Sequence, residues 1–233
     1  MNFSKIIRQI CPPIIISAYK KFYALKFKSK NPVYHSDPGQ QDLNVYWTPE
    51  MAEKLENWGK DHVWIEIECL MINCKGKVLD IACGTGVNLL ALSRFPFLDL
   101  YGFDISELLI SKAREKGIDD GRLQVNDATK TDYRNNEFDF SYSIGSLEHF
   151  TEDGIQLFLQ ECSRYTSKAS FHMIPISENN LNNGWIKRDQ SYFNNSVDWW
   201  LKKFNSCFSQ VYVLNSGWKD PGTSVGKWFI CYK

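Results

Sequence analysis

Residues 77–90, KVLDIACGTGVNLL, decide the fold of this chain. Residues 77–82 are a short apolar run that predicts a buried strand, and residues 83–86 predict a sharp turn. From Val87 onward the apolar residues recur at helical spacing, which predicts a helix. The stretch therefore predicts a strand, a tight turn and a helix in immediate succession.

The glycines of this turn suit a ligand site. Gly84 and Gly86 lack a Cβ, so a ligand can lie directly against the backbone there. The N–H groups that open the following helix point toward such a ligand. Asp80, at the carboxyl end of the predicted strand, adds a hydrogen-bond acceptor beside these backbone donors.

The pattern Asp80, Ala82, Gly84, Gly86 resembles motif I of the class I S-adenosylmethionine (SAM) dependent methyltransferases, acid-x-Gly-x-Gly-x-Gly. Alanine replaces the first glycine of the motif. A dinucleotide fingerprint would need a further glycine. Residues 87–89 are Val-Asn-Leu, so the nicotinamide cofactor is disfavoured. The resemblance implies that SAM is the cofactor and that these four residues contact it.

The resemblance also implies an α/β fold, a doubly wound, mostly parallel seven-stranded sheet with helices on both faces. The site is then expected at the carboxyl ends of the parallel strands. Residues 208–215 and 227–233 are predicted to form the C-terminal antiparallel hairpin. We expect two parts, a basic and apolar N-terminal arm at 1–36 and the methyltransferase domain at 37–233.

Local signals place the helices between the strands. Thr48 is a plausible N-cap with proline next to it, and it opens a helix predicted to run through Trp58. Further helices are predicted at about 62–72, 106–116 and 151–165, and Ser196 is predicted to cap the last one. Strands are predicted to end at Asp104, near 126–128 and at Ile144, and a fifth spans 169–176.

Asp104 ends the second predicted strand roughly 20 residues past the glycine turn, where this architecture hydrogen-bonds a ribose diol. Its alternative role is to cap the next helix, for which Ser106 already has the chemistry. The resemblance favours the ribose, and it places Ile105 beside the cofactor as well. After the third strand, Asp127 and Ala128 match the family's contacts to the adenine amino group and ring nitrogen.

The strand 138–144 and the sequence after it resemble motif IV of the family and its post-motif, with Leu-Glu-His at 147–149. The resemblance puts Ile144 at the cofactor and His149 near the transferred methyl. His149 is predicted to be the general base, since imidazole titrates near neutrality. The alternative is a ring that packs on the cofactor or bonds a backbone carbonyl. Related quinone-pathway enzymes hold a metal through extra acids here, but residues 144–146 contain none, so no metal is expected.

The acceptor site is predicted from aromatic residues on both sides of the motifs. Tyr46 and Trp47 are candidates for a lid over the cofactor, and Trp185 and Tyr192 for stacking on a sugar or a planar metabolite. Each of them is alternatively an ordinary core aromatic. Residues 177–195 are polar and predicted to be irregular. Their asparagines could either hydrogen-bond the hydroxyls of an acceptor or form a loop.

The amino-acid composition limits the classes of partner and compartment that suit this chain. The 27 cationic and 27 acidic side chains cancel, which argues against a general nucleic-acid binder. Residues 1–36 nevertheless carry seven cations and no acid. Basic and apolar residues together there suit an anionic membrane face, or alternatively an arm packed on the domain or on a second subunit. Seven cysteines without a C-x-x-C pair suit a reduced, cytoplasmic compartment.

The sequence thus predicts methyl transfer from SAM to a hydroxyl or amine of a small molecule. A sugar or a surface-glycan precursor, which is sometimes lipid-linked, is the first candidate. The rivals are a methyltransferase acting on protein and a non-catalytic SAM-binding scaffold at a membrane. The acceptor atom and the oligomeric state do not follow from the sequence.

Overall fold

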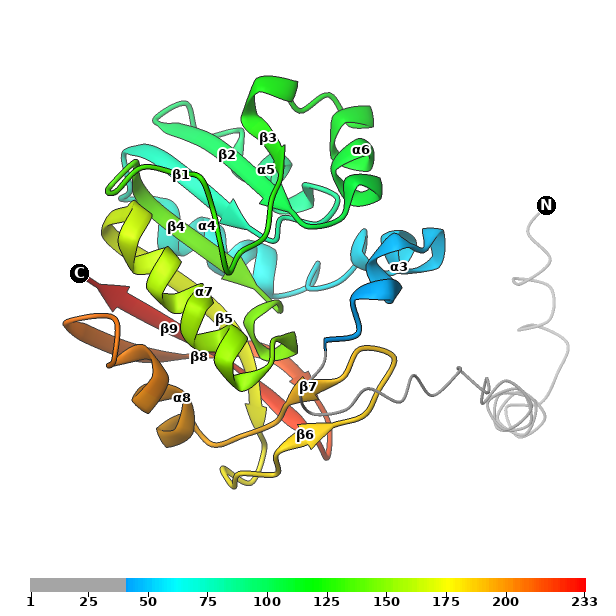
Figure 1. Cartoon of the computed structure of the whole chain (residues 1–233), viewed down its shortest axis with the longest axis vertical. Helices are drawn as coiled ribbons and strands as arrows, with labels where there is room; N and C mark the ends of the chain where they lie inside the picture. The colour runs from blue at the N-terminus through cyan, green and yellow to red at the C-terminus, as the bar shows by residue number, and fades with distance from the viewer. Residues whose placement is uncertain (1–40) are drawn as a thin grey trace, which may run out of the picture. The chain divides into compact units, whose positions relative to one another are not determined.

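A computed structural model describes residues 41–233, so the predicted arm at 1–36 lies outside the described residues (Figure 1). Its centre is a seven-stranded sheet in the order β3-β2-β1-β4-β5-β9-β8. The strands are β1 Gly76–Ile81, β2 Leu98–Asp104, β3 Leu123–Val125, β4 Phe138–Ile144, β5 Thr166–Ser177, β8 Gln210–Asp220 and β9 Ser224–Tyr232.

The first five strands are parallel to their neighbours, and β9 is antiparallel to both β5 and β8. From β1 the chain moves outward to β2 and β3 and then returns to β4 on the other side of β1. The order of the strands therefore reverses between β1 and β4, and the carboxyl ends of these two strands frame a ligand crevice. The predicted doubly wound fold, including its C-terminal antiparallel hairpin, is confirmed.

Helices cover both faces of the sheet because each face carries apolar side chains. One face packs against α4 (Val63–Met71), α5 (Val87–Leu92) and α6 (Glu107–Glu115). The other packs against α7 (Glu152–Tyr165) and α8 (Val197–Phe204), which lie in front of the sheet in Figure 1. Trp200 of α8 is fully buried, and Phe204 stacks on Phe229 of β9 at 4.8 Å between ring centroids. The aromatic residues of α8 are therefore core.

Hydroxyl side chains begin four of the helices. Thr48 accepts a hydrogen bond from Met51 N at the start of α3 (Pro49–Leu55), and Ser196 accepts one from Trp199 N at the start of α8. Both caps were predicted. Ser106 and Thr151 cap α6 and α7 in the same way. Each such cap typically stabilises its helix by about 1 kcal/mol.

The helix predicted to run through Trp58 ends earlier. α3 stops at Leu55, and residues 56–61 form turns. The carbonyl of Gly59 accepts N–H groups from Val63 and its two neighbours, which open α4. Beyond Leu55 the backbone bonds tighten, with Asn57 N donating to Lys54 O and Trp58 N to Leu55 O, and Gly59 then takes a left-handed φ of 76° that ends the helix.

The C-terminal hairpin is longer than predicted. β8 runs to Asp220, and a hydrogen bond of 3.0 Å from Thr223 N to Asp220 O closes a tight turn. The strand absorbs the expected loop residues through a register shift between Asn215 and Lys219. Glu66 of α4 holds this bulge, because its carboxylate accepts Ser216 Oγ at 2.7 Å and the Gly217 amide at 2.6 Å.

The polar segment after β5 contains a short hairpin, β6 (Trp185–Ile186) with β7 (Tyr192–Phe193), where no regular structure was predicted. Asparagine side chains frame it by bonding backbone groups within the segment. Asn182 Oδ1 accepts Ser196 N at 3.1 Å, and Asn195 Oδ1 accepts Gly184 N at 2.8 Å. These two asparagines stabilise the loop. No helix among the described residues is long and apolar enough to cross a membrane.

Candidate active site

The turn after β1 presents backbone to a pocket. Ala82, Gly84 and Gly86 have φ angles of 55°, 55° and 75°. Ala82 is the strained member, because a side chain in this region costs about 1–2 kcal/mol. A Cβ on Gly84 would meet only Leu55 Cδ1, at 3.7 Å, whereas one on Gly86 would lie 2.5 Å from Ile118 Cδ1. Gly84 therefore faces the pocket, and Gly86 allows close packing of the α5 terminus.

Asp104, at the end of β2, holds this turn in place. Its Oδ2 accepts the Gly84 amide and its Oδ1 accepts the Ser106 amide, each at 2.9 Å. The carboxyl group is buried, which raises its pKa to about 6 against the opposing effect of these amides. Asp104 lines the pocket. It also supports the start of α6, because it holds the amide of Ser106, whose side chain caps that helix.

Asp80 lies beneath the pocket and does not line it. Its Oδ2 accepts the hydroxyl of Tyr142 at 2.9 Å, and burial raises its pKa well above the usual value. The bond ties β1 to β4 at the point where the strand order reverses. Asp80 therefore supports the floor of the crevice.

The segment after β3 forms one wall of the pocket through Asn126, Asp127 and Ala128. Asp127 Oδ1 accepts both the amide and the hydroxyl of Thr129 at 2.8 Å, and the Asp127 amide donates to Asn126 Oδ1. These local bonds make a compact turn. They do not join the turn to the rest of the fold, so its position depends on contacts with neighbouring elements.

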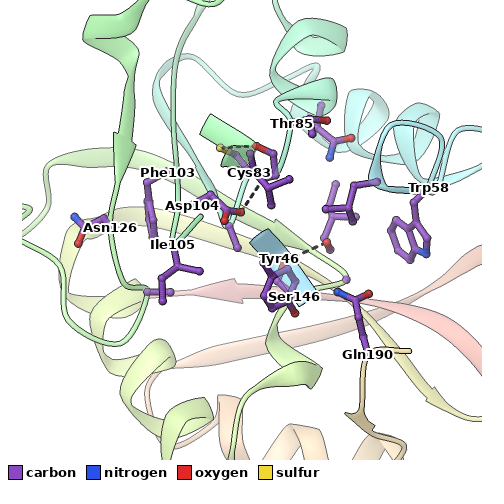
Figure 2. A pocket seen from close by; sticks show the side chains of 18 of the residues that line it. Tyr46, Trp58, Cys83, Thr85, Phe103, Asp104, Ile105, Asn126, Ser146 and Gln190 are labelled. Atoms are coloured by element: carbon purple, nitrogen blue, oxygen red, sulfur yellow. Dashed lines mark hydrogen bonds between the residues drawn. The ribbon is translucent and has the colours of Figure 1, made fainter. Parts of the chain in front are cut away.

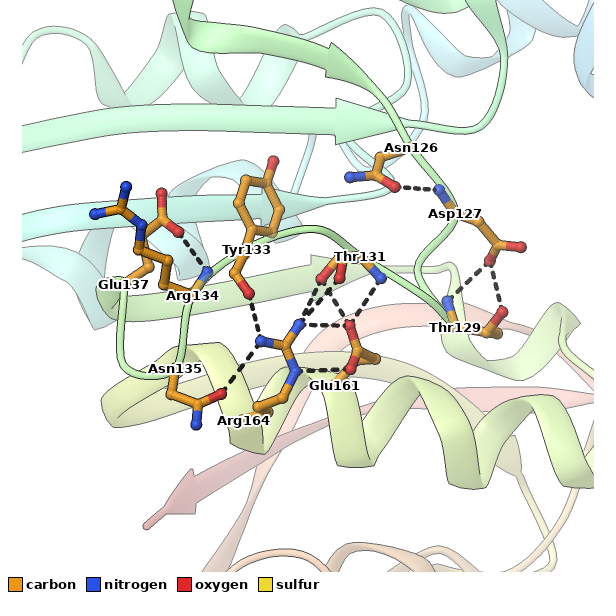
Figure 3. Close-up of polar contacts among 10 residues, drawn as sticks. All are labelled: Asn126, Asp127, Thr129, Thr131, Tyr133, Arg134, Asn135, Glu137, Glu161 and Arg164. Carbon is orange, nitrogen blue, oxygen red and sulfur yellow. Dashed lines mark hydrogen bonds and ion pairs between the residues drawn. The ribbon is translucent and has the colours of Figure 1, made fainter.

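An ion pair on α7 holds that segment from behind (Figure 3). The guanidinium of Arg164 donates to the carbonyls of Thr131 and Tyr133 and pairs with Glu161 at 2.8 Å. Glu161 Oε2 in turn accepts the amide of Thr131 at 2.8 Å and its hydroxyl at 2.7 Å. The Arg164 guanidinium and these hydrogen bonds lower the pKa of Glu161 to about 2.

Glu161→Gln is expected to destabilise the fold by about 1–2 kcal/mol at neutral pH, since it removes charge-assisted hydrogen bonds. The folded-state pKa is depressed, so this stabilisation is present above the unfolded pKa of about 4.3 and is lost as the pH falls toward about 2. Urea unfolding at several pH values measures it. Glu115→Gln, which breaks the exposed pair with Lys112, is the matched control, and its effect should stay below about 0.5 kcal/mol. Equal effects of the two changes would contradict the assignment.

The pocket lies at the carboxyl ends of β1, β2 and β4 and encloses about 890 Å³, counting its open mouth. In Figure 2, Ile105 and Asn126 lie at one end, and Trp58 and Gln190 at the other. Of the predicted cofactor residues, seven line it, namely Ala82, Gly84, Asp104, Ile105, Asp127, Ala128 and Ile144.

Two segments meet over the other end of the pocket. Residues 41–58, which include the 3-10 helix η1 (Leu43–Trp47), contribute Tyr46 and Trp58, and the β6–β7 loop contributes Gln190. Asp42 Oδ2 accepts the Ser191 amide at 2.9 Å, which joins the two segments. We call residues 41–58 and 187–191 the roof.

A further contact closes the roof. Lys54 Nζ lies 3.1 Å from Asp189 Oδ2, and Tyr46 and Gln190, one from each segment, both line the pocket. Burial raises the pKa of Tyr46, so it remains a neutral hydrogen-bonding group. Tyr46 therefore lies where a lid was predicted.

His149, in the 3-10 helix η3 (Leu147–His149), lies under the roof, just outside the residues that line the pocket. Its Nδ1 is 2.8 Å from the carbonyl oxygen of Ser191. A carbonyl only accepts, so Nδ1 carries the proton and Nε2 keeps its lone pair. Burial lowers the pKa of His149 to about 4, so the ring is neutral at neutral pH.

The other predicted acceptor residues lie away from the pocket lining. Trp47 is 45% exposed and does not line the pocket, whereas its neighbour Tyr46 does. Trp185 packs edge-on against Phe193 at 4.8 Å between centroids. Tyr192 packs on His149 at 6.2 Å and shares a hydrogen bond with Ser224. Trp185 and Tyr192 support the roof loop, and the structure does not bring them into the pocket itself.

Several lining residues were not predicted. They come from residues 41–58, from the glycine turn and α5, from the segments after β3 and β4, and from the roof loop. They include Gln41, Leu43, Leu55, Trp58, Thr85, Asn88, Asn126, Ser146, Phe150 and Gln190. Thr85 and Asn88 follow directly from the turn and could have been found by continuing the motif into the helix. Gln41 and Gln190 are ordinary surface residues in the sequence, and only the tertiary fold brings them together.

Residues 78–169 match the family model described as a methyltransferase domain. Residues 78–169 therefore carry a methyltransferase domain. This match and the structural neighbours named as SAM-dependent methyltransferases support SAM as the cofactor. No curated protein matches the sequence.

Solved structures share the fold of this methyltransferase domain and its flanking elements. One is the "SAM-dependent methyltransferase, possible histamine N-methyltransferase" of Thermotoga maritima, at 16% identity and TM-score 0.61 over 82% of this chain and 99% of that chain. A SAM-dependent methyltransferase of Aquifex aeolicus has 18% identity and TM-score 0.58 over 79% and 98%. The cyclase SpnF has 18% identity and TM-score 0.53 over 66% and 57%. A cyclase among them shows that the fold alone does not give the reaction.

The residues present fit SAM. Thr85 Oγ1 and Asn88 Oδ1 are buried in the pocket wall with no hydrogen-bond partner among residues 41–233. Buried polar atoms in native proteins are normally bonded, so these two require a polar ligand. SAM offers both donors and acceptors for these two atoms.

Proposed function

We propose that this methyltransferase acts on a hydroxyl or amine of a small neutral molecule, with a sugar as the first candidate. The observation that carries the proposal is the chemistry of the roofed end of the pocket. Its lining contains no charged side chain among the described residues and consists of Gln41, Leu43, Tyr46, Leu55, Trp58, Ser146, Phe150 and Gln190. Aromatic faces with a few amide and hydroxyl groups suit the flat apolar face and the hydroxyls of a sugar.

The absence of charge in this lining speaks against ionic acceptors. Transfer of an unpaired charge from water into such a site is costly, so an anionic acceptor would need a cation in the wall. The nearest roof cation, Lys54, is already paired with Asp189. The roof also argues against a protein acceptor, because a folded surface could not reach beneath two joined segments.

We assign the cofactor contacts residue by residue. Each carboxylate oxygen of Asp104 accepts one amide and has further lone pairs, which we assign to the two ribose hydroxyls. Asp127 is assigned to the adenine amino group and the Ala128 amide to a ring nitrogen. Asp80 and Gly86 act from outside the lining by holding β1 and α5 in position.

The bound sulfonium supplies an activated methyl group, so the protein must mainly align the acceptor and exclude water. Gly84, after β1, and Ile144, at the end of β4, contact the cofactor. Tyr46 and Gln190 orient the acceptor beneath the roof. We assign to His149 the removal of the acceptor proton, since its Nε2 lone pair is held in place by the bond from Nδ1 to Ser191.

A matched panel of acceptors tests the proposal. The enzyme is incubated with SAM and either methyl glycosides or their uronate and phosphate counterparts, and methylated product is measured by mass spectrometry. The neutral sugars are expected to react with at least about tenfold higher kcat/KM than the charged ones. The reason is that the lining of the roofed end offers no cation to pair with a uronate or phosphate group. Transfer only to a protein, or tight SAM binding without transfer to any hydroxyl or amine, would contradict the proposal.

A membrane-bound, lipid-linked acceptor remains a separate proposal. It rests on the basic and apolar sequence of residues 1–36, which lie outside the described residues.

A further inference from the structure

Glu148 is a buried carboxyl group next to the acceptor end of the pocket. It lies in η3 between Ser146 and Phe150, both of which line the pocket. The side chain of Glu148 is only 2% exposed, and its Oε2 has no hydrogen-bond partner within the part of the chain that the structure describes. A buried carboxyl oxygen without a partner is costly, so it requires a function.

Its neighbour is the imidazole of His149. The Oε1 atom of Glu148 lies 3.7 Å from His149 Nε2. Because the Ser191 carbonyl accepts the proton on Nδ1, Nε2 faces Glu148 with a bare lone pair. A carboxylate would repel that lone pair, whereas a protonated carboxyl can point its O–H at it. At 3.7 Å the two atoms are beyond hydrogen-bond distance, so they interact through charge, and a proton on Glu148 removes the repulsion.

The surroundings of the pair favour this neutral state. Burial raises the pKa of Glu148 to about 8 and lowers the pKa of His149 to about 4. The groups that act electrostatically on the pair are Asp42 and Lys54 on the roof, and the pair in turn affects Tyr46 and Tyr192. His172 lies on β5, which also packs against η3.

These neighbouring groups are engaged by other partners, so they do not exchange protons with Glu148 or His149. Asp42 is engaged by the Ser191 amide, and Lys54 is paired with Asp189. His172 has Ser143 and Ser170 on its two ring nitrogens. Within this cluster, exchange of a proton is therefore left to Glu148 and His149.

We propose that Glu148 and His149 form one proton-accepting unit, in which Glu148 finally holds the proton that the acceptor hydroxyl loses. This inference rests on the proposed function. The imidazole keeps 13% of its surface exposed and is the member that an acceptor reaches, so Glu148 acts through it as a positioning residue.

The oxygen of the acceptor forms a bond to the methyl carbon, the bond between that carbon and sulfur breaks, and its electron pair stays on sulfur. The O–H bond of the acceptor breaks, and the proton moves to His149 Nε2 and is then shared with the Glu148 carboxylate. A pair that already holds a proton would become a buried cation, so only the ionised pair accepts the proton without a buried net charge.

The pair must be ionised to act, so kcat/KM is expected to rise with pH through a midpoint near the Glu148 pKa of about 8. Below that pH the pair already holds its proton, and the rate falls. A base consisting of His149 alone would already be active from about pH 4 upward.

Glu148→Gln tests the unit, because it has the same shape and cannot ionise. The variant is expected to lose the rise with pH and to be slower than wild type by roughly tenfold or more on the alkaline side, with unchanged SAM affinity. Glu148→Asp, which restores an ionisable group, should bring the rise back with a shifted midpoint. A Glu148→Gln enzyme with the wild-type pH profile would overturn the inference.

A second measurement does not depend on turnover. The ring nitrogen signals of His149 in an NMR titration should move through a midpoint near 8 in the wild type, as Glu148 ionises beside Nε2. They should show no such step in Glu148→Gln. A step that persists in the variant would overturn the inference. If the proposed function is wrong instead, the titration stays intact while no hydroxyl or amine is methylated.

Discussion

Asp104→Ala is expected to weaken SAM binding by about 3 kcal/mol, which is roughly 100-fold or more in Kd. The change removes the acceptor assigned to both ribose hydroxyls. It also releases the amides of Gly84 and Ser106, each now 2.9 Å from a carboxylate oxygen, so the glycine turn loses its support. Calorimetric titration with SAM measures the affinity, and circular dichroism establishes that the variant is folded.

Asp80→Asn is the matched control. Asp80 is as well buried as Asp104 and lies at the end of the neighbouring strand, but it does not line the pocket. Its bond to Tyr142 can be kept by the amide oxygen of asparagine. We expect this variant to bind SAM within a few-fold of wild type. A folded Asp104→Ala protein with wild-type affinity would remove the ribose assignment, whereas equal losses in both variants would show that any disturbance of the crevice floor weakens binding.

The same carboxyl group makes SAM binding depend on pH. Burial raises the pKa of Asp104 to about 6. Two hydroxyl donors stabilise the ionised form, so the ligand lowers this pKa when it binds and affinity is highest above it. Affinity is therefore expected to fall as the pH decreases below about 6, with proton release on binding in that range.

The cofactor end of the site could be predicted from the sequence because it depends on local order. Asp104 ends β2, and Gly84 and Asp127 follow closely after β1 and β3. Parallel strands bring their carboxyl ends together whatever the loops do. Asp80 has the same position in the chain but points into the sheet, where it bonds Tyr142. Which way a strand-terminal side chain points depends on the register with the next strand, and a single sequence does not specify that.

The acceptor end could not be predicted in the same way. Trp58 and Gln190 are far apart in the sequence and meet only through the roof, which depends on single contacts such as that of Lys54 with Asp189. Aromatic residues of the second half were candidates for stacking on an acceptor, but Trp200 is core. Composition shows that aromatic residues are present, whereas packing decides which of them a ligand can reach.

His149→Gln is expected to reduce kcat for a hydroxyl acceptor by roughly 100-fold or more, with little change in SAM affinity. Glutamine keeps a side-chain N–H for the Ser191 carbonyl, so the roof contact survives while the base is lost. His149 does not line the pocket, which is why cofactor binding should be spared. Steady-state kinetics on the true acceptor and SAM calorimetry separate the two effects.

His172→Gln is the control for loss of a buried histidine. His172 is fully buried on β5 with Ser143 and Ser170 on its ring nitrogens, and it has no contact with the roof. Its loss should lower the melting temperature while the folded fraction keeps its kcat. An amine acceptor that is already neutral needs little help with its proton, so a small effect of His149→Gln together with methylated amine as product would assign N-methylation. A hydroxyl acceptor with near wild-type kcat in His149→Gln would exclude the imidazole as the base and leave alignment and the sulfonium as the main sources of the rate.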